Sequence, residues 1–235
     1  AFIARGEVFV TSVDGSLTKR ITNTPEQEQF VQFAPDGKSI VYASERDGKW
    51  RIYQAKKIRD KEEPFFYAST LIQEEPLVSN EFDNYQPIIS PDGKKVACTL
   101  DVTKTSYNGN LNSRVSLADF NNSNGSVNNE AFIVKDGNPH GCAFSPSSNY
   151  LYINSTDNGV IRYDVNNGTN TQILSTSSSL GGGNIYGSLR LASNGSIYVA
   201  DYGSNYLGRI SNPDSPSASY SSTALYLGFR DSGYG

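Results

Sequence analysis

The chain has 235 residues, a net charge of −4 and a pI near 5.1, and 37% of its residues are hydrophobic. This length is enough for one all-β domain with a sizeable core. The acidic balance and the lack of a dense basic patch exclude a nucleic-acid surface. Because no apolar run is long enough to span a bilayer, we expect a soluble chain with no membrane span.

The first 25 residues predict three short strands, in the segments FIA, EVFVTSV and TKRIT. Each segment is rich in β-branched or apolar residues, and Gly or Asp-Gly separates them, as in short hairpins. The blades that follow predict four strands each, so this first group lacks the innermost strand.

A strand-turn-strand unit is then written four times. The copies are QFAPDGKSIVYAS from Gln32, IISPDGKKVACTL from Ile88, AFSPSSNYLYINS from Ala143 and RLASNGSIYVADY from Arg190. In each copy an apolar strand enters a turn rich in Pro, Gly or Asn and leaves as a second strand, which is hairpin chemistry. The turn anchors Pro35, Pro91, Pro146 and Ser193 lie 56, 55 and 47 residues apart, a period that holds about four strands.

The remaining strands extend outward from each repeat. The second blade is predicted at 28–34, 39–44, 50–56 and 66–73; the third at 84–90, 95–101, 112–119 and 130–135; the fourth at 140–145, 150–155, 159–165 and 170–175; and the last at 186–192, 196–201, 206–211 and 218–228. Trp50, after an Asp47-Gly48 hairpin turn, is predicted to pack between blades.

These elements predict an all-β fold, a β-propeller of five blades of four-stranded antiparallel sheets, as a single domain over 1–235. Closure of the ring requires the missing inner strand from the other terminus or from a second copy. We therefore expect a monomer or a strand-sharing dimer.

Three polar segments are interpreted as structural. Residues 119–125 and 164–170 place oxygens at alternate positions, but neither ends in the Glu of a calcium loop, so we predict hairpin turns. The glycine run 180–184 precedes a strand and not a helix, which favours a linker over a phosphate-binding loop. We expect no metal and no cofactor.

The surface chemistry changes near residue 97. Residues 1–97 carry 28 charged side chains and 3 Asn, whereas the remaining 138 residues carry 16 charged side chains and 19 Asn. This seam suggests that the two parts have different origins.

The segments TKRITNTPEQEQFVQFAPDGKSIVYASERDGKWRIYQAKK and EEPLVSNEFDNYQPIISPDGKKVA resemble the TolB-like propeller repeats of tricorn-like envelope peptidases. Residues from about 98 to 235, with PHGCAFSPSSNYLYI and GSLRLASNGSIYVADYG, are similar to propellers that precede a gliding-motility-type sorting domain in secreted proteins of Bacteroidetes. The resemblance to the first family ends, and the resemblance to the second begins, at SPDGKKVA, which suggests a natural or engineered chimera. It implies a periplasmic, cell-surface or secreted location.

Catalytic chemistry has little support in the sequence. His140 is the only histidine, so it is the one candidate base for a Ser-His-Asp or Cys-His arrangement. In tricorn-like peptidases the resemblance implies catalytic residues in later domains, and none can be carried over. We predict a non-catalytic scaffold or recognition module; the alternative is the substrate-gating propeller of such a peptidase.

A ligand site is expected at the mouth of the central channel, where the innermost strands begin. The candidate residues are Glu28, Asp83, Tyr85, His140 and Tyr186. The alternative is that His140 fills the channel wall and that the tyrosines are packing residues. A protein, peptide or glycan is the expected partner, and Cys98 and Cys142 are expected to be buried free thiols unless a disulfide joins them.

Overall fold

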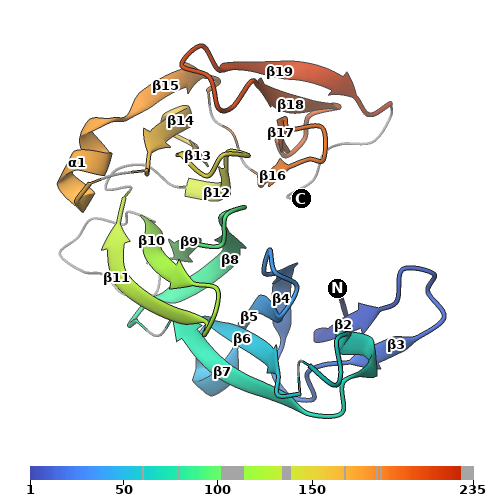
Figure 1. Cartoon of the computed structure of the whole chain (residues 1–235). Coiled ribbons are helices and arrows are strands. Elements are labelled where there is room, and N and C mark those ends of the chain that lie inside the picture. The colour runs from blue at the N-terminus through green and yellow to red at the C-terminus, as the bar shows by residue number, and fades with distance from the viewer. Residues whose placement is uncertain are drawn as a thin grey trace.

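The computed structural model describes residues 1–59, 61–78, 80–101, 114–133, 139–166, 168–183, 185 and 187–228. Within these ranges the chain forms five antiparallel sheets, one with three strands and four with four strands. The sheets follow one another around a common centre, and β4, β8, β12 and β16 are the strands nearest to it (Figure 1). This arrangement is a β-propeller, as predicted.

The sheets are built in chain order. The first contains β1 (Phe2–Ala4), β2 (Glu7–Thr11) and β3 (Thr18–Arg20). The second contains β4 (Glu28–Phe33), β5 (Ser39–Ser44), β6 (Arg51–Lys57) and β7 (Ile72–Val78). The third contains β8 (Asp83–Ile89), β9 (Lys95–Asp101), β10 (Arg114–Asn121) and β11 (Ser126–Phe132). The fourth contains β12 (Pro139–Phe144), β13 (Tyr150–Ser155), β14 (Gly159–Asp164) and β15 (Ser178–Gly181), and the fifth contains β16 (Leu189–Leu191), β17 (Ile197–Val199), β18 (Tyr206–Ser211) and β19 (Ser219–Tyr226).

The repeated turns form for local chemical reasons. In the second sheet the Asp36 carboxylate accepts the backbone N–H of Lys38 at 2.9 Å, and Gly37 has φ +68°. Asp92 accepts the N–H of Lys94 in the same way at 3.1 Å in the third sheet. An Asp that binds the backbone two residues on, followed by a residue with positive φ, reverses the chain within a few residues. The PDGK motif therefore specifies the hairpin that joins the two innermost strands.

Apolar clusters between neighbouring sheets hold the propeller together. Val8 of the first sheet packs with Tyr42 of the second, and Leu117 of the third packs with Ile153 of the fourth. A fully buried aliphatic side chain such as Ile153, which is 0% exposed, contributes about 1.5–3 kcal/mol. Trp50 lies in the cluster between the second and third sheets, which confirms its predicted packing role.

The first sheet has three strands, as the sequence predicted. Strand β1 pairs with β2 alone among the described strands, in the register Phe2 to Phe9. The ring of Phe2 stacks on Phe9 with centroids 5.6 Å apart, and Phe2 is 41% exposed. How the ring closes, and whether a second copy contributes a strand, stay predictions.

The predicted strand at 170–175 is wrong. Asn170–Ser175 forms the helix α1, and the fourth strand of this sheet is β15, further along the chain. The backbone N–H of Thr169 donates to the Gln172 side chain at 2.7 Å, which is half of a capping box. Residues 164–170 therefore lead into a helix and are not a tight hairpin turn, whereas 122–125 do connect β10 to β11 as predicted.

Several further boundaries differ from the predictions, among them the strand predicted at 130–135, which is β11 (Ser126–Phe132). The Asp47-Gly48 turn is part of a short 3-10 helix, Arg46–Gly48, in a six-residue connection between β5 and β6. The predicted strand 66–73 divides into a 3-10 helix, Phe66–Ala68, and β7. The predicted linker 180–184 begins inside β15. Leu180 lies within this strand, and Gly181 pairs with Val160 of β14.

The compositional seam near residue 97 falls inside β9. Since β9 pairs with both β8 and β10, residues from the two segments share the third sheet. The separate origins of the segments stay a prediction. Cys98 and Cys142 are both buried and free, as expected.

Candidate functional site

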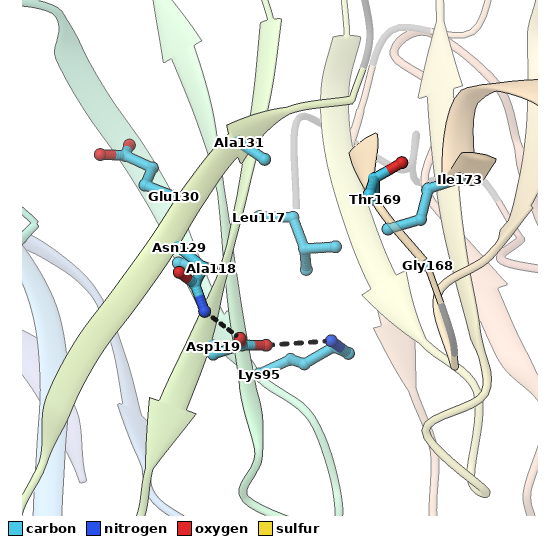
Figure 2. A pocket seen from close by; sticks show the side chains of 10 residues that line it. All are labelled: Lys95, Leu117, Ala118, Asp119, Asn129, Glu130, Ala131, Gly168, Thr169 and Ile173. Atoms are coloured by element: carbon cyan, nitrogen blue, oxygen red, sulfur yellow. Dashed lines mark hydrogen bonds and ion pairs between the residues drawn. The ribbon is translucent and has the colours of Figure 1, made fainter. Parts of the chain in front are cut away.

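A cavity lies between the third sheet and helix α1 (Figure 2). Its volume is about 400 Å³. We call it the interblade cavity; it is lined by Lys95, Leu117, Ala118, Asp119, Asn129, Glu130, Ala131, Gly168, Thr169 and Ile173. Strands β9, β10 and β11 supply one wall, and the segment that begins α1 supplies the other, which is typical of a pocket between packed elements.

Apolar side chains form the floor of the interblade cavity. Leu117 and Ile173 are 3% and 4% exposed and belong to the core cluster shared by the third and fourth sheets. Ala131, on β11, is 5% exposed and presents only a methyl group. The floor is therefore rigid, because its members are fixed by the core.

A polar group on β9, β10 and β11 borders this floor. Lys95 lies directly opposite Asp119 across the strand pair, and its Nζ is 3.2 Å from Oδ1 of Asp119. The Asn129 amide donates to the other oxygen of Asp119 at 2.9 Å (Figure 2). The Asn129 hydrogen bond, together with the Lys95 charge, lowers the pKa of Asp119, so this carboxylate is ionised at neutral pH.

The interblade cavity was not predicted from the sequence. Two signals were present: Thr169-x-x-Gln172, which is typical of a helix start, and the separation of Lys95 from Asp119 on successive strands. The pairing of Asp119 with Lys95 is regular, whereas the β10–β11 pair bulges beside Asn129, whose side chain reaches Asp119. One sequence does not reveal such a bulge.

The predicted channel site depends on the innermost strands, and three of these strands bulge near their starts. The register shifts between Gln29 and Gln32 on β4, between Tyr85 and Ile88 on β8, and between Pro139 and Gly141 on β12. A bulge changes the direction of the side chains around it and is frequent next to binding sites. The inner wall is therefore irregular at the same level in three successive sheets.

Tyr85 and His140 occupy equivalent positions on this inner wall. Each lies five residues before the turn serine of its repeat, Ser90 or Ser145, and each is partly exposed. The Tyr85 ring packs against Trp50 with centroids 5.4 Å apart. Burial lowers the pKa of His140, so its imidazole is neutral at pH 7 and offers one donor and one acceptor.

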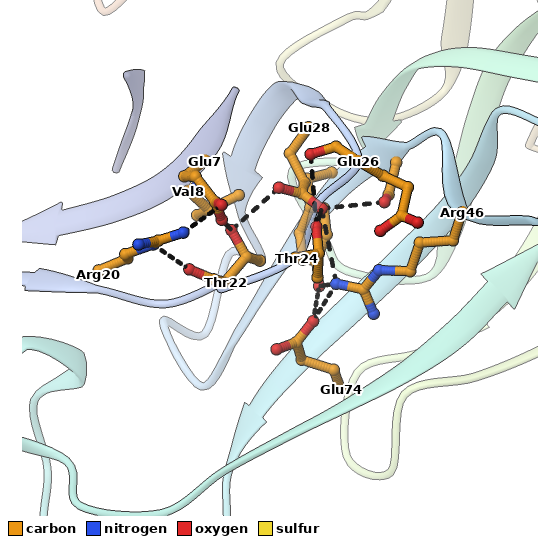
Figure 3. Close-up of polar contacts among 11 residues, drawn as sticks. Glu7, Val8, Arg20, Thr22, Thr24, Glu26, Glu28, Arg46 and Glu74 are labelled. Atoms are coloured by element: carbon orange, nitrogen blue, oxygen red, sulfur yellow. Dashed lines mark hydrogen bonds and ion pairs between the residues drawn. The ribbon is translucent and has the colours of Figure 1, made fainter. Parts of the chain in front are cut away.

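Glu28 lies inside the interface between the first two sheets and is 0% exposed (Figure 3). Its carboxylate accepts hydrogen bonds from the hydroxyls of Thr24 at 2.9 Å and Ser44 at 3.0 Å. The Thr22 hydroxyl lies 3.1 Å from Glu28 and 2.6 Å from Glu7, and its single proton serves one of the two carboxylates at a time. Glu28 is thus engaged by internal donors.

Two arginines and two further glutamates share the network around Glu28. Arg20 forms an ion pair with Glu7, and Arg46 pairs with Glu74 and lies 3.6 Å from Glu28 (Figure 3). Burial raises the pKa of Glu28, although the hydroxyl donors partly offset this effect. Burial also raises the pKa of Glu7, but the hydrogen bonds from Thr22 and Arg20 outweigh it and the net shift is downward. This network stabilises the blade interface.

The other two predicted residues are placed differently. Asp83 is 8% exposed, and its Oδ1 accepts the backbone N–H of Trp50 at 2.9 Å, so it holds the connection between the second and third sheets. Tyr186 lies outside the described residues. The structure therefore leaves Tyr85 and His140 partly exposed on the inner wall and places Glu28 and Asp83 in buried interactions; a ligand role for any of them stays a prediction.

The described ranges contain neither a metal-binding cluster nor a membrane-spanning helix. No group of three or more His, Cys, Asp or Glu side chains there is arranged to hold a metal ion. No helix in these ranges is long and apolar enough to cross a membrane.

Comparison with known proteins identifies the fold. No protein-family model and no curated protein matches the chain. Among solved structures, TolB from Acinetobacter baumannii is similar with a TM-score of 0.57 and 19% identity, over 92% of this chain and 49% of that one. A putative TolB from Agrobacterium tumefaciens gives a TM-score of 0.57 and 17% identity, over 91% of this chain and 68% of that one.

An enzyme is also among the similar structures. The periplasmic gluconolactonase of Pseudomonas aeruginosa gives a TM-score of 0.54 and 15% identity, over 97% of this chain and 66% of that one. This chain thus spans about half the length of the first TolB structure and about two thirds of the other two. At these identities the similarity shows the TolB-like propeller fold alone, since one propeller fold serves many functions.

Proposed function

We propose that this chain is a non-catalytic recognition module that binds a polypeptide segment at the interblade cavity. The observation that carries the proposal is the apolar floor of Leu117, Ala131 and Ile173 beside the polar group of Lys95, Asp119 and Asn129. A floor of aliphatic groups takes up an aliphatic side chain, and the polar rim offers partners to the peptide backbone around it.

A polypeptide fits the interblade cavity better than a glycan does. Sugar rings are commonly held against aromatic side chains, whose amphipathic faces suit them. The ten residues that line this cavity include no aromatic side chain. The WD40-repeat structure of RRP9, which has a TM-score of 0.56 and 15% identity over 90% of this chain, belongs to the same class of fold. Together with the TolB structures it supports a scaffold role, and the periplasmic gluconolactonase supports a periplasmic location as part of this proposal.

Selection from a phage-displayed library of random peptides, followed by calorimetric titration of the best binder, tests the proposal. Ala131→Phe fills the cavity with an aromatic ring and is expected to weaken binding at least about tenfold. The matched control is Ala224→Phe on β19, the outermost strand of the fifth sheet, which is expected to leave the affinity unchanged. Equal affinities of the wild type and Ala131→Phe would overturn the cavity as the site.

A double variant separates the cavity from the channel mouth. If Tyr85→Ala with His140→Ala abolishes binding while Ala131→Phe does not, the ligand binds on the inner wall. Hydrolysis of gluconolactone provides the enzymatic counterpart: turnover by the chain that falls in His140→Ala would overturn the non-catalytic assignment.

A further inference from the structure

A second, smaller cavity lies between the second and third sheets. Its volume is about 180 Å³, and its lining includes Lys38, Gln54, Lys56, Lys57, Asn122 and Gly125. We call it the lysine cavity. The turn that joins β10 to β11 closes it, and the Lys56 ammonium donates to the carbonyl of Asn124 in that turn at 2.7 Å. This cavity shares no residue with the interblade cavity.

A buried acceptor without a partner lies in this cavity. Gln54 is 1% exposed, its amide nitrogen donates to the Ser39 hydroxyl at 2.9 Å, and its Oε1 has no hydrogen-bond partner. Oδ1 of Asn122, also on the lining, is buried and without a partner as well. A buried polar atom left unpaired costs about 1–3 kcal/mol, so two such oxygens in the lining of one cavity point to a ligand that carries hydrogen-bond donors.

The turn approaches this wall closely because of one glycine. A Cβ at Gly125 would lie 2.2 Å from Oε1 of Gln54 and 2.7 Å from Nζ of Lys56, and Gly125 has φ +69°. Any side chain there would occupy the space in front of the unpaired oxygen. The glycine therefore keeps open the part of the cavity that faces Gln54.

The charge of the lysine cavity selects the other part of the ligand. Three of its nine lining residues are lysines and none is acidic. Lys56 is paired with Glu75, and the ammonium of Lys57 donates to the Pro64 carbonyl at 2.5 Å and lies 5.5 Å from the centre of the Phe66 ring. A lining with three ammonium groups and no carboxylate favours an anion, and a carboxylate accepts well from several of them.

We propose that the lysine cavity binds a small hydroxylated anion, a sugar acid, with its carboxylate toward the lysines and its hydroxyls donating to Gln54 and Asn122. The volume equals that of about six water molecules, which suits a single sugar unit and excludes longer chains. A simple inorganic anion satisfies the lysines but brings no donor for Oε1 of Gln54. A neutral sugar brings a donor for Oε1 of Gln54 but no negative charge for the lysines.

Calorimetric titration of the whole chain with four probes tests this site: D-glucuronate, D-glucose, acetate and sulfate. Glucuronate is expected to bind at least about tenfold more tightly than each of the others, because it alone carries both an anionic group and hydroxyl donors. Asn122→Ala, in the turn, and Gln54→Met are each expected to weaken glucuronate about tenfold while leaving sulfate unchanged.

Lys94→Met is the matched control, because Lys94 has a side chain that is 79% exposed and does not line the cavity. It should leave glucuronate affinity unchanged, and thermal melts confirm that each variant is folded. Equal binding of glucuronate and sulfate would reduce the site to a nonspecific anion contact and overturn the proposal. Failure of glucuronate to bind would mean that water alone satisfies the two oxygens, which also overturns it.

Discussion

The hydroxyl of Ser44 is predicted to stabilise the fold through the charge of Glu28. Both residues are 0% exposed, and the hydroxyl donates to the carboxylate at 3.0 Å. Hydrogen bonds to charged groups contribute about 1.5–3 kcal/mol each, so Ser44→Ala is expected to lower the free energy of unfolding by about 2 kcal/mol. For a chain of this length that corresponds to a fall of about 4–8 °C in Tm.

Ser155→Ala is the matched control for this prediction. Ser155 pairs with Pro139 at the start of β12 as Ser44 pairs with Glu28 at the start of β4, and it is also 0% exposed. Its hydroxyl accepts the backbone N–H of Asn158 at 3.0 Å, a neutral hydrogen bond. The expected loss is therefore smaller, about 1 kcal/mol.

The pH dependence distinguishes a charge effect from simple packing at Ser44. Burial raises the pKa of Glu28 in the folded protein, and loss of the Ser44 donor raises it further. A carboxyl whose pKa rises on folding lowers stability above the folded pKa, and this penalty disappears as pH falls toward the unfolded pKa. The deficit of Ser44→Ala should thus be full at about pH 8 and shrink in acid, measured by urea unfolding. A deficit no larger than that of Ser155→Ala, or one that is constant with pH, would refute this reasoning.

Three further predictions concern the packing of the core. Cys98 and Cys142 should not react with a thiol reagent until urea unfolds the chain, because burial raises the pKa of Cys142 to about 12 and that of Cys98 well above its usual value; fast reaction without urea would contradict their burial. Tyr152→Phe removes a hydroxyl that donates to the Pro213 carbonyl at 2.7 Å and should cost about 1 kcal/mol in urea unfolding. Gly141→Ala would place a Cβ 2.9 Å from the Cα of Ser188, which directly precedes β16, and should lower the free energy of unfolding by about 1–3 kcal/mol. An unchanged Tm would show that β12 and β16 are not in contact.

The sequence predicted the propeller because its turns are specified locally. Asp36 and Gly37, and the same pair in the next repeat, are sufficient to specify a hairpin turn. The order of the strands could therefore be predicted from the positions of these turns. Helix α1 was missed because β-branched residues in Asn170–Ser175 favoured a strand, while the helical signal was limited to Thr169 and Gln172.

The candidate site was less predictable for a different reason. Glu28 was expected to face a ligand, yet it is enclosed by Thr22 and Thr24, in the connection from the first sheet, and by Ser44, its pairing partner on β5. In the interblade cavity, Asn129, which donates to Asp119, lies at a bulge in the β10–β11 pair. Features that arise from contacts between sheets leave no fixed spacing in the sequence, unlike turns.

Photo-crosslinking tests the central claim most directly. A selected peptide in which photo-leucine replaces its aliphatic anchor is irradiated with the full chain, and the adduct is located by mass spectrometry after proteolysis. We predict adducts on β10, β11 and α1, around Leu117, Ala131 and Ile173, and their loss in Ala131→Phe. Adducts confined to β8 and β12, around Tyr85 and His140, would contradict the account and place recognition on the inner wall.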